Sequence, residues 1–259
     1  MTRLAPMSFG LARGRALDPG RAGVSARDLP GLPADPAAVD AARLDPRGWF
    51  DDPGRPFEIE IGPGKGGFLV ETALARPGVN ILGVEWAREF WRYTADRCRR
   101  RGLESRVRVL HADAVEFLRW RCAPGVADVI HLYYSDPWPK KKHYKRRVLR
   151  DEFLAEAHRV LKPGGRLCVV TDHDGYWAWM QEYFERWCAP EAPARFQRLS
   201  DDEARSLIRA FRTPAEPATA PPRESRRPDE ALVGTNYERK FTGGAKAPHA
   251  AVLVAITQQ

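Results

Sequence analysis

The sequence contains few cysteines and no long apolar run, and both absences narrow the class of protein. Its four cysteines lie far apart without a Cys-x-x-Cys pair, so we expect no disulfide framework and no bound metal. No stretch of about 18 apolar residues predicts a transmembrane helix, and Pro6, Gly10 and Gly14 interrupt the segment where a signal peptide would lie. The sequence therefore predicts a cytoplasmic protein with no membrane partner, and it leaves open whether the protein is a monomer or a homodimer.

Acidic residues are missing from one segment, and this is the strongest feature of the charge distribution. The whole chain has 42 Lys and Arg against 34 Asp and Glu, a net charge of +8 and a pI near 9.5. Residues 140–150 carry seven basic side chains and no acid, and they directly follow the Ser-Asp-Pro-Trp-Pro segment at 135–139. A dense positive charge favours nucleic acid, whereas the lone carboxylate of Asp136 suits work on a polar centre. The combination predicts chemistry on a nucleic-acid base.

Two proline-rich stretches flank or interrupt the predicted domain. Residues 1–56 hold eight prolines and eight arginines, which indicates an extended or mobile N-terminal arm with a short helix near 36–44. Residues 213–230 hold five prolines and indicate a long surface loop within a domain that spans 57–259. The sequence does not assign a function to the arm or to the loop.

Alternating apolar patterns in this domain predict an α/β fold. Strands are expected at 57–61, 79–84, 107–110, 126–134 and 166–171, with closing strands at 232–241 and 250–256. Helices are expected at 68–74, 86–98, 114–121, 149–161 and 176–187. Such an alternation is typical of a doubly wound parallel sheet with helices on both faces.

Glycines are concentrated between the first expected strand and the first expected helix, where a nucleotide cofactor would bind. Gly62, Gly64 and Gly67 fit the dinucleotide pattern G-x-G-x-x-G, whereas Gly62, Gly64 and Gly66 fit the shorter G-x-G-x-G. Glu85 ends the second expected strand, where an acid can bind ribose hydroxyls. The spacing alone permits NAD, S-adenosylmethionine or a purely structural turn.

Two further acids favour S-adenosyl-L-methionine. Glu60 precedes the first glycine, where a carboxylate would repel a pyrophosphate but suits a cationic methionine moiety. Asp113 follows the third expected strand and suits the adenine amino group. Asp136 follows the fourth strand, at the edge where open α/β sheets bind their ligands, in a loop stiffened by two prolines. Trp138 in that loop either stacks on a ring or packs in the core.

In their order along the chain, these motifs resemble those of the bacterial tRNA (guanine-N7)-methyltransferases. The resemblance covers about residues 57–257 and rests on Glu60-Ile61-Gly62, Gly83-Val84-Glu85, Asp113, residues 135–141, residues 143–147, residues 161–165, Thr171-Asp172 and residues 235–238. It implies a Rossmann-like class I methyltransferase sheet, mostly parallel with an antiparallel C-terminal strand. It also implies methyl transfer from S-adenosylmethionine to N7 of a guanine in the tRNA variable loop, forming 7-methylguanosine.

The resemblance also implies roles for individual residues. The cofactor side comprises Glu60, Gly62, Gly64, Gly66, Glu85, Asp113 and Asp136, and Asp136 is the expected catalytic residue. The substrate side comprises Lys140, Asp172, Thr235, Asn236, Tyr237 and Glu238. The residues expected to contact RNA are Lys141, Lys142, His143, Tyr144, Lys145, Arg146 and Arg147.

The chemistry of guanine N7 needs no general base, because its in-plane lone pair is free at neutral pH. Positioning and electrostatic stabilisation are then the expected sources of catalysis. Three rival hypotheses are an NAD-dependent oxidoreductase, an amine methyltransferase acting on adenine or cytosine, and an RNA-binding protein without activity. The basic segment 140–150 argues against the first, Trp138 in place of a second proline against the second, and the cofactor-facing acids against the third.

Overall fold

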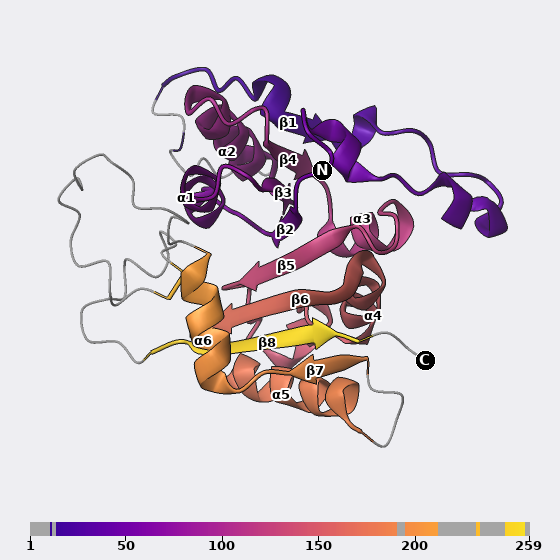
Figure 1. The fold of residues 1–259 in the computed structure, drawn as a ribbon, viewed down its shortest axis with the longest axis vertical. Helices are drawn as coiled ribbons and strands as arrows, with labels where there is room; N and C mark the ends of the chain where they lie inside the picture. Colours follow the sequence, from indigo (N-terminus) through magenta and orange to yellow (C-terminus); the bar gives the residue numbers. More distant parts are fainter. Residues whose placement is uncertain (1–10, 12–13, 191–194, 212–231, 234–246, 257–259) are drawn as a thin grey trace.

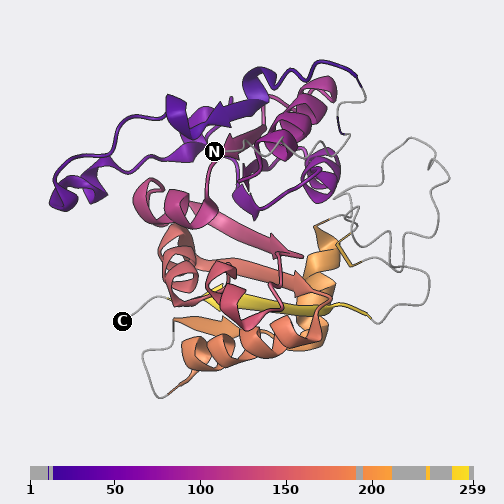
Figure 2. The ribbon, with the colours of Figure 1, turned by 180° about the vertical axis from the view of Figure 1, so that it is seen from behind.

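An eight-stranded sheet organises the chain (Figures 1 and 2). The computed structural model describes residues 11, 14–190, 195–211, 232–233 and 247–256. The strand order is β1-β4-β3-β2-β5-β6-β8-β7, and every neighbouring pair is parallel except those that β8 forms with β6 and β7. The strands are β1 (Gly23–Ser25), β2 (Phe57–Ile61), β3 (Asn80–Glu85), β4 (Val107–His111), β5 (Ala127–Tyr133), β6 (Leu161–Thr171), β7 (Phe196–Arg198) and β8 (His249–Ala255). The predicted class of sheet is confirmed, including its antiparallel C-terminal strand.

Helices cover both faces of this sheet. The helices are α1 (Gly67–Ala75), α2 (Arg88–Arg100), α3 (Ala114–Trp120), α4 (Asp151–Val160), α5 (Asp174–Cys188) and α6 (Asp201–Ala210). Buried side chains of α3, α4 and α5 pack in one core cluster, and those of α1, α2 and α6 pack in two others. The central strand β2 is buried along its whole length, with Phe57, Ile59 and Ile61 in the α3–α5 cluster. Alternation of strand side chains therefore directs Glu58 and Glu60 to the other face.

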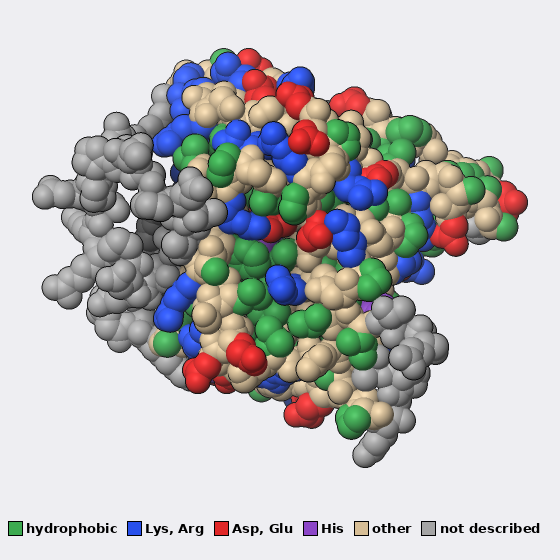
Figure 3. Space-filling view, viewed as in Figure 1, with side chains coloured by type: hydrophobic (Ala, Val, Ile, Leu, Met, Phe, Trp, Pro, Cys, Tyr) green, Lys and Arg blue, Asp and Glu red, His purple; other side chains and the backbone are tan. Residues whose placement is uncertain are grey.

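The N-terminal arm differs from the prediction, because its described part docks on the domain. It adds β1 to the edge of the sheet beside β4 and then forms short 3-10 helices, two of them at Pro36–Ala38 and Asp40–Ala42, near the predicted helix. The buried carboxylate of Asp96 in α2 accepts hydrogen bonds from Arg15 at 3.0 Å and from Arg100 at 2.9 Å. The ion pair between Arg15 and the buried Asp96 links the proline-rich arm to α2 and helps to hold it in place. In Figure 3, Lys and Arg side chains gather in the upper part of the view, the part in which Figure 1 draws α2.

The sequence-based prediction did not include the short strands β1 and β7 or the helix α6. Helix α6 carries a recognisable signal, because Ser200 and Glu203 form a capping box at its start. The predicted loop 213–230 lies outside the described residues, as does the strand 232–241 apart from Leu232 and Val233. Within the described part of the chain, no helix has the length and apolarity needed to cross a membrane.

Candidate functional site

The predicted cofactor and catalytic residues come together at the carboxyl edge of the sheet. Parallel pairing places Glu60 beside both Gly83 and His131, and Glu85 beside His111. The glycine loop, Asp113 and Asp136 each follow one of these strands directly. Because the carboxyl ends of parallel strands meet at one edge, four segments that are distant in sequence come together there.

The backbone of the glycine loop shows which of its glycines adopt a left-handed conformation. Gly62, Gly64 and Gly66 have φ angles of +68°, +54° and +65°, whereas Gly67 is the first residue of α1 and is not in the left-handed region. These three are the glycines of the shorter G-x-G-x-G pattern, whereas Gly67, the last glycine of the dinucleotide pattern, is buried at the start of α1. Left-handed backbone is readily available only to glycine, so all three positions require it.

Helix α2 fixes this loop from behind. Thr94 Oγ1 donates a hydrogen bond to the carbonyl of Gly64 at 2.6 Å, and Arg97 donates to the carbonyls of Lys65 and Gly66 at 2.9 and 3.1 Å. A Cβ atom on Gly66 would lie 2.5 Å from Cγ2 of Thr94, so the loop and the helix are in direct contact. The glycine loop is thereby preorganised by its own protein contacts.

Glu60 is a buried acid without a full set of partners. Its side chain is 3% exposed, and Oε2 has no hydrogen-bond partner among the residues that the structure describes. Burial and the charge of Glu85 raise the pKa of Glu60 to about 8, although the N–H of Leu69 opposes this increase. A buried carboxyl oxygen that is left unpaired is costly, and a cationic or hydrogen-bonding ligand would compensate for it.

Glu85 connects the second strand to the glycine loop. Its Oε2 accepts the N–H of Gly64 at 2.9 Å, and its Oε1 accepts the N–H of Ala87 at 2.8 Å. Burial raises the pKa of Glu85, the two N–H groups lower it, and the charge of Asp136 raises it further. This last effect indicates that Asp136 and Glu85 are close enough to interact.

Asp136 lies exposed in a constrained loop after β5. The nearby Tyr134 and Trp138 have φ angles of +52° and +41°, in the region that residues other than glycine rarely adopt. Such strain persists only where surrounding contacts enforce it, and it often marks a functional site. The loop therefore presents Asp136 in a fixed position at the carboxyl edge.

The predicted RNA-contacting segment forms a 3-10 helix, η6 (Lys141–Arg146). Exposed cations on and beside it are Lys140, Lys141, Lys142, Lys145 and Arg146, and none of them forms an ion pair within the described ranges of the chain. His143 and Tyr144 are half-buried. Trp138 belongs to none of the described core clusters. Its ring instead lies 4.9 Å from the guanidinium of Arg146 and 5.6 Å from the ring of His143.

Arg147 departs from the predicted RNA-contacting set. Its side chain is 2% exposed, because Tyr144, Tyr176 and Trp179 surround the guanidinium. A side chain enclosed in this way does not present its charge to a polyanion. The sequence-based assignment of Arg147 to the RNA surface is therefore at odds with the structure.

Other predicted site residues occupy the expected edge. Asp172 is exposed at the end of β6, and His173, not Asp172, caps α5 by accepting the N–H of Tyr176 at 3.1 Å. Asp113 is exposed and accepts the N–H of Glu116 at 3.1 Å as the cap of α3. The predicted substrate residues Thr235, Asn236, Tyr237 and Glu238 lie outside the described residues.

One residue of this edge was missed by the sequence analysis. Trp86 follows Glu85 directly and is 73% exposed, unusually high for so large an apolar side chain. An exposed indole beside an acid that suits a ribose offers a face for an aromatic base. The sequence signal that could have identified Trp86 is its position directly after Glu85, the acid that ends β3.

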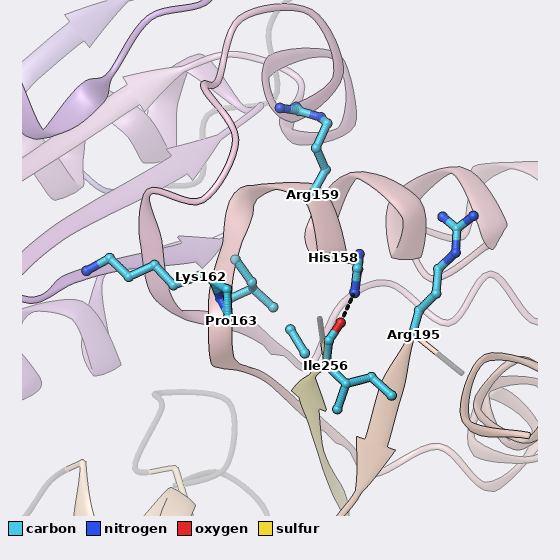
Figure 4. A pocket seen from close by; sticks show the side chains of 8 residues that line it. His158, Arg159, Lys162, Pro163, Arg195 and Ile256 are labelled. Carbon is cyan, nitrogen blue, oxygen red and sulfur yellow. Dashed lines mark hydrogen bonds between the residues drawn. The ribbon is translucent and has the colours of Figure 1, made fainter. Parts of the chain in front are cut away.

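A cavity of 280 Å³ lies at the opposite edge of the sheet (Figure 4). Its lining includes Arg159, Lys162 and Arg195. Lys162 pairs with Asp128 at 2.8 Å, and Arg159 pairs with Glu156 at 2.7 Å and donates to backbone carbonyls. Most of its positive charge is neutralised within the protein, and its position separates it from the site at the carboxyl edge. It is not the candidate site.

Comparisons with known proteins show what this chain is similar to. Residues 54–215 match the family model Methyltransf_4, described as "Putative methyltransferase". The chain is 36% identical to a tRNA (guanine-N(7)-)-methyltransferase of Nitrobacter hamburgensis, over 69% of this chain and 68% of that protein. It is 37% identical to the protein of the same name from Rhizobium johnstonii, over 66% and 72%. A solved S-adenosylmethionine-dependent O-methyltransferase from Thermotoga maritima matches with 15% identity, 90% and 70% coverage and a TM-score of 0.46.

Proposed function

This chain belongs to the tRNA (guanine-N(7)-)-methyltransferase family, and we propose that it methylates N7 of a guanine in the variable loop of tRNA. The methyl donor is S-adenosyl-L-methionine. The observation that carries the proposal is the meeting of three features at one edge: a glycine loop flanked by buried acids, the fixed carboxylate of Asp136, and an exposed basic segment. Because tRNA is the substrate, the cytoplasm is the proposed location.

The residues at the carboxyl edge fit the cofactor. When bound, S-adenosylmethionine supplies an electrophilic methyl group on a cationic sulfur. Glu60 offers the unpaired Oε2 in a buried position, and the three left-handed glycines allow close approach of the backbone. Glu85 and Asp113 provide acceptors for hydroxyl and amino groups, and Trp86 provides an exposed ring face.

Asp136 is proposed to hold the guanine. Its carboxylate can accept hydrogen bonds from the N1–H and amino group of guanine, an edge that adenine does not offer because its N1 carries no proton. Methyl transfer places positive charge on the guanine ring, and a fixed carboxylate next to the ring stabilises that charge. Asp172 lies exposed at the end of the adjacent strand β6 and is the second candidate for this role.

The test of the proposed function is methyl transfer from labelled S-adenosylmethionine to an unmodified tRNA transcript, followed by nucleoside analysis. We expect 7-methylguanosine at a variable-loop guanine, and no product from a transcript in which that guanine is replaced by adenine. Label in another nucleoside would contradict the proposed base, and label at another guanine the proposed position. An absence of transfer would contradict the activity itself.

A pH-dependent affinity for S-adenosylmethionine is a further expected result. Because the pKa of Glu60 is about 8 in the free protein, binding a cation below that pH requires loss of its proton. Affinity should therefore rise by up to about tenfold per pH unit as pH increases toward 8, and then level off. The raised pKa of Glu60 also affects folding. Its contribution to the free energy of unfolding falls as pH rises from 4.5, the ordinary pKa of a glutamate, to about 8.

Calorimetric titration of the unaltered protein and of Glu60→Gln between pH 6.5 and 8.5 would test this dependence. The ligand's amino group titrates in the same range, so the quantity of interest is the ratio of the two affinities. We expect this ratio to grow with pH in favour of the unaltered protein. Glu182→Gln, which removes an exposed glutamate from α5, is the matched control. A ratio that is independent of pH would show that Glu60 does not take part.

A further inference from the structure

Arg147 is buried within an otherwise exposed basic segment. Its guanidinium carbon lies 3.7 Å from the ring centre of Tyr144, 4.9 Å from that of Trp179 and 5.1 Å from that of Tyr176. It forms no ion pair with an acid among the described residues, whereas a buried charge needs compensation. The three ring faces provide cation–π attraction in place of a carboxylate. This arrangement holds the guanidinium in one position.

The fixed guanidinium contacts the loop that carries Asp136. Nε of Arg147 donates a hydrogen bond to the carbonyl oxygen of Pro137 at 2.8 Å, directly after Asp136 in the chain. On the other side, Oγ of Ser135 lies 3.4 Å from the hydroxyl of Tyr176, the ring over which Arg147 lies. The residues before and after Asp136 are thus both held by the same pair of buried side chains.

The strained backbone of this loop explains why the contacts from Arg147 and Tyr176 are required. Left-handed φ angles at Tyr134 and Trp138 bracket Asp136, and neither residue is a glycine. A backbone in this state relaxes when the contacts that enforce it are removed. Relaxation would move the Asp136 carboxylate, and displacement of a reacting group by about 1 Å can lower a rate by about 100-fold.

We propose that Arg147 is a positioning residue, which fixes Asp136 for methyl transfer instead of contacting RNA phosphates. This role rests on the proposed function of the chain. It predicts that loss of Arg147 lowers kcat and leaves the affinities for S-adenosylmethionine and tRNA nearly unchanged. A phosphate contact predicts the reverse, with weaker tRNA binding and an intact kcat at saturating tRNA.

The first test compares Arg147→Met with the unaltered protein. We expect kcat to fall by about 10- to 100-fold, while the Kd of S-adenosylmethionine stays within about a factor of three. The dependence of log Kd for tRNA on log salt should keep its slope, because no phosphate contact is lost. Arg147→Lys keeps the charge among the rings but not the geometry of the Nε donor. Its kcat should therefore lie between those of Arg147→Met and of the unaltered protein.

A matched pair at Trp179 tests the ring contacts without altering the basic segment. Both Trp179→Phe and Trp179→Leu remove the indole hydrogen bond to the carbonyl of Leu149 at 3.1 Å. Only the phenylalanine variant keeps a ring over the guanidinium. We expect the leucine variant to have the lower kcat, with an equal salt slope in both. If Arg147→Met does not fold, this pair of variants still tests whether Arg147 positions the loop.

Four results would overturn the proposal. A salt slope that falls by about 0.7–0.9 with kcat unchanged would make Arg147 a phosphate contact. An unchanged kcat in Arg147→Met would show that the contact between Arg147 and the loop has no effect on the reaction. Equal kcat values in the two Trp179 variants would show the same. If the unaltered chain forms no 7-methylguanosine, the proposed function itself is wrong, and Arg147 loses the proposed role with it.

Discussion

Asp136→Ala is expected to lower kcat for tRNA methylation by about 100- to 1,000-fold, the size typical of losing one preorganised electrostatic contact. The reaction moves positive charge from the cofactor sulfur to the guanine ring, so a carboxylate fixed near the ring stabilises the transition state more than the ground state. Asp136 is exposed and interacts electrostatically with Glu85, while the backbone around it is constrained. These features support the proposed position of Asp136 between the cofactor and the incoming base.

Single-turnover kinetics with saturating S-adenosylmethionine and tRNA would measure this effect, and equilibrium titration would measure cofactor affinity separately. We expect the affinity of Asp136→Ala for S-adenosylmethionine to change by a modest factor, because Glu60, Glu85 and the glycine loop remain. Asp202→Ala, which removes an exposed aspartate from α6, controls for the change in charge. Intact turnover in Asp136→Ala would show that the catalytic assignment is wrong.

The fold was predictable because its signals are local. Apolar alternation located β2 to within a residue, and most of the other central strands and helices to within a few residues. The edge strands β1 and β7 have only three residues each, too few for a periodic pattern, and depend on neighbours distant in sequence. The docking of the arm has the same origin, because Asp96 lies far along the chain from Arg15.

The candidate site was predictable in part. Glu60 was identified by its position just before the glycine loop, because burial does not distinguish it from Glu58 of the same strand, which is paired with Arg76 at 2.7 Å. Which glycines of the loop are left-handed could not be read from the sequence, because Gly66 and Gly67 are adjacent and only Gly66 has a positive φ angle. Arg147 could not be distinguished from Arg146, because burial of Arg147 depends on rings contributed by α5, about 30 residues away.

Neutralising the exposed basic segment should have the second-largest effect, on binding instead of turnover. The variant replaces Lys141, Lys142, Lys145 and Arg146 with glutamine. If each side chain contacts one phosphate, the slope of log K against log salt should become shallower by about 3. The Kd for tRNA should then rise on the order of 100-fold at ~0.15 M salt, because fewer counterions are released on binding. Filter binding or fluorescence titration across a salt series measures both quantities.

A control with the same loss of charge separates this segment from the general positive charge of the protein. Suitable exposed positions elsewhere are Arg27, Arg101, Arg119 and Arg166. We expect their replacement by glutamine to leave the salt slope nearly unchanged, and an equal change in both variants would mean that tRNA responds only to net charge. The segment variant should retain its kcat at saturating tRNA, whereas Asp136→Ala should retain its salt slope. Opposite responses of this kind would assign affinity to the exposed cations of 141–146 and chemistry to the loop that carries Asp136.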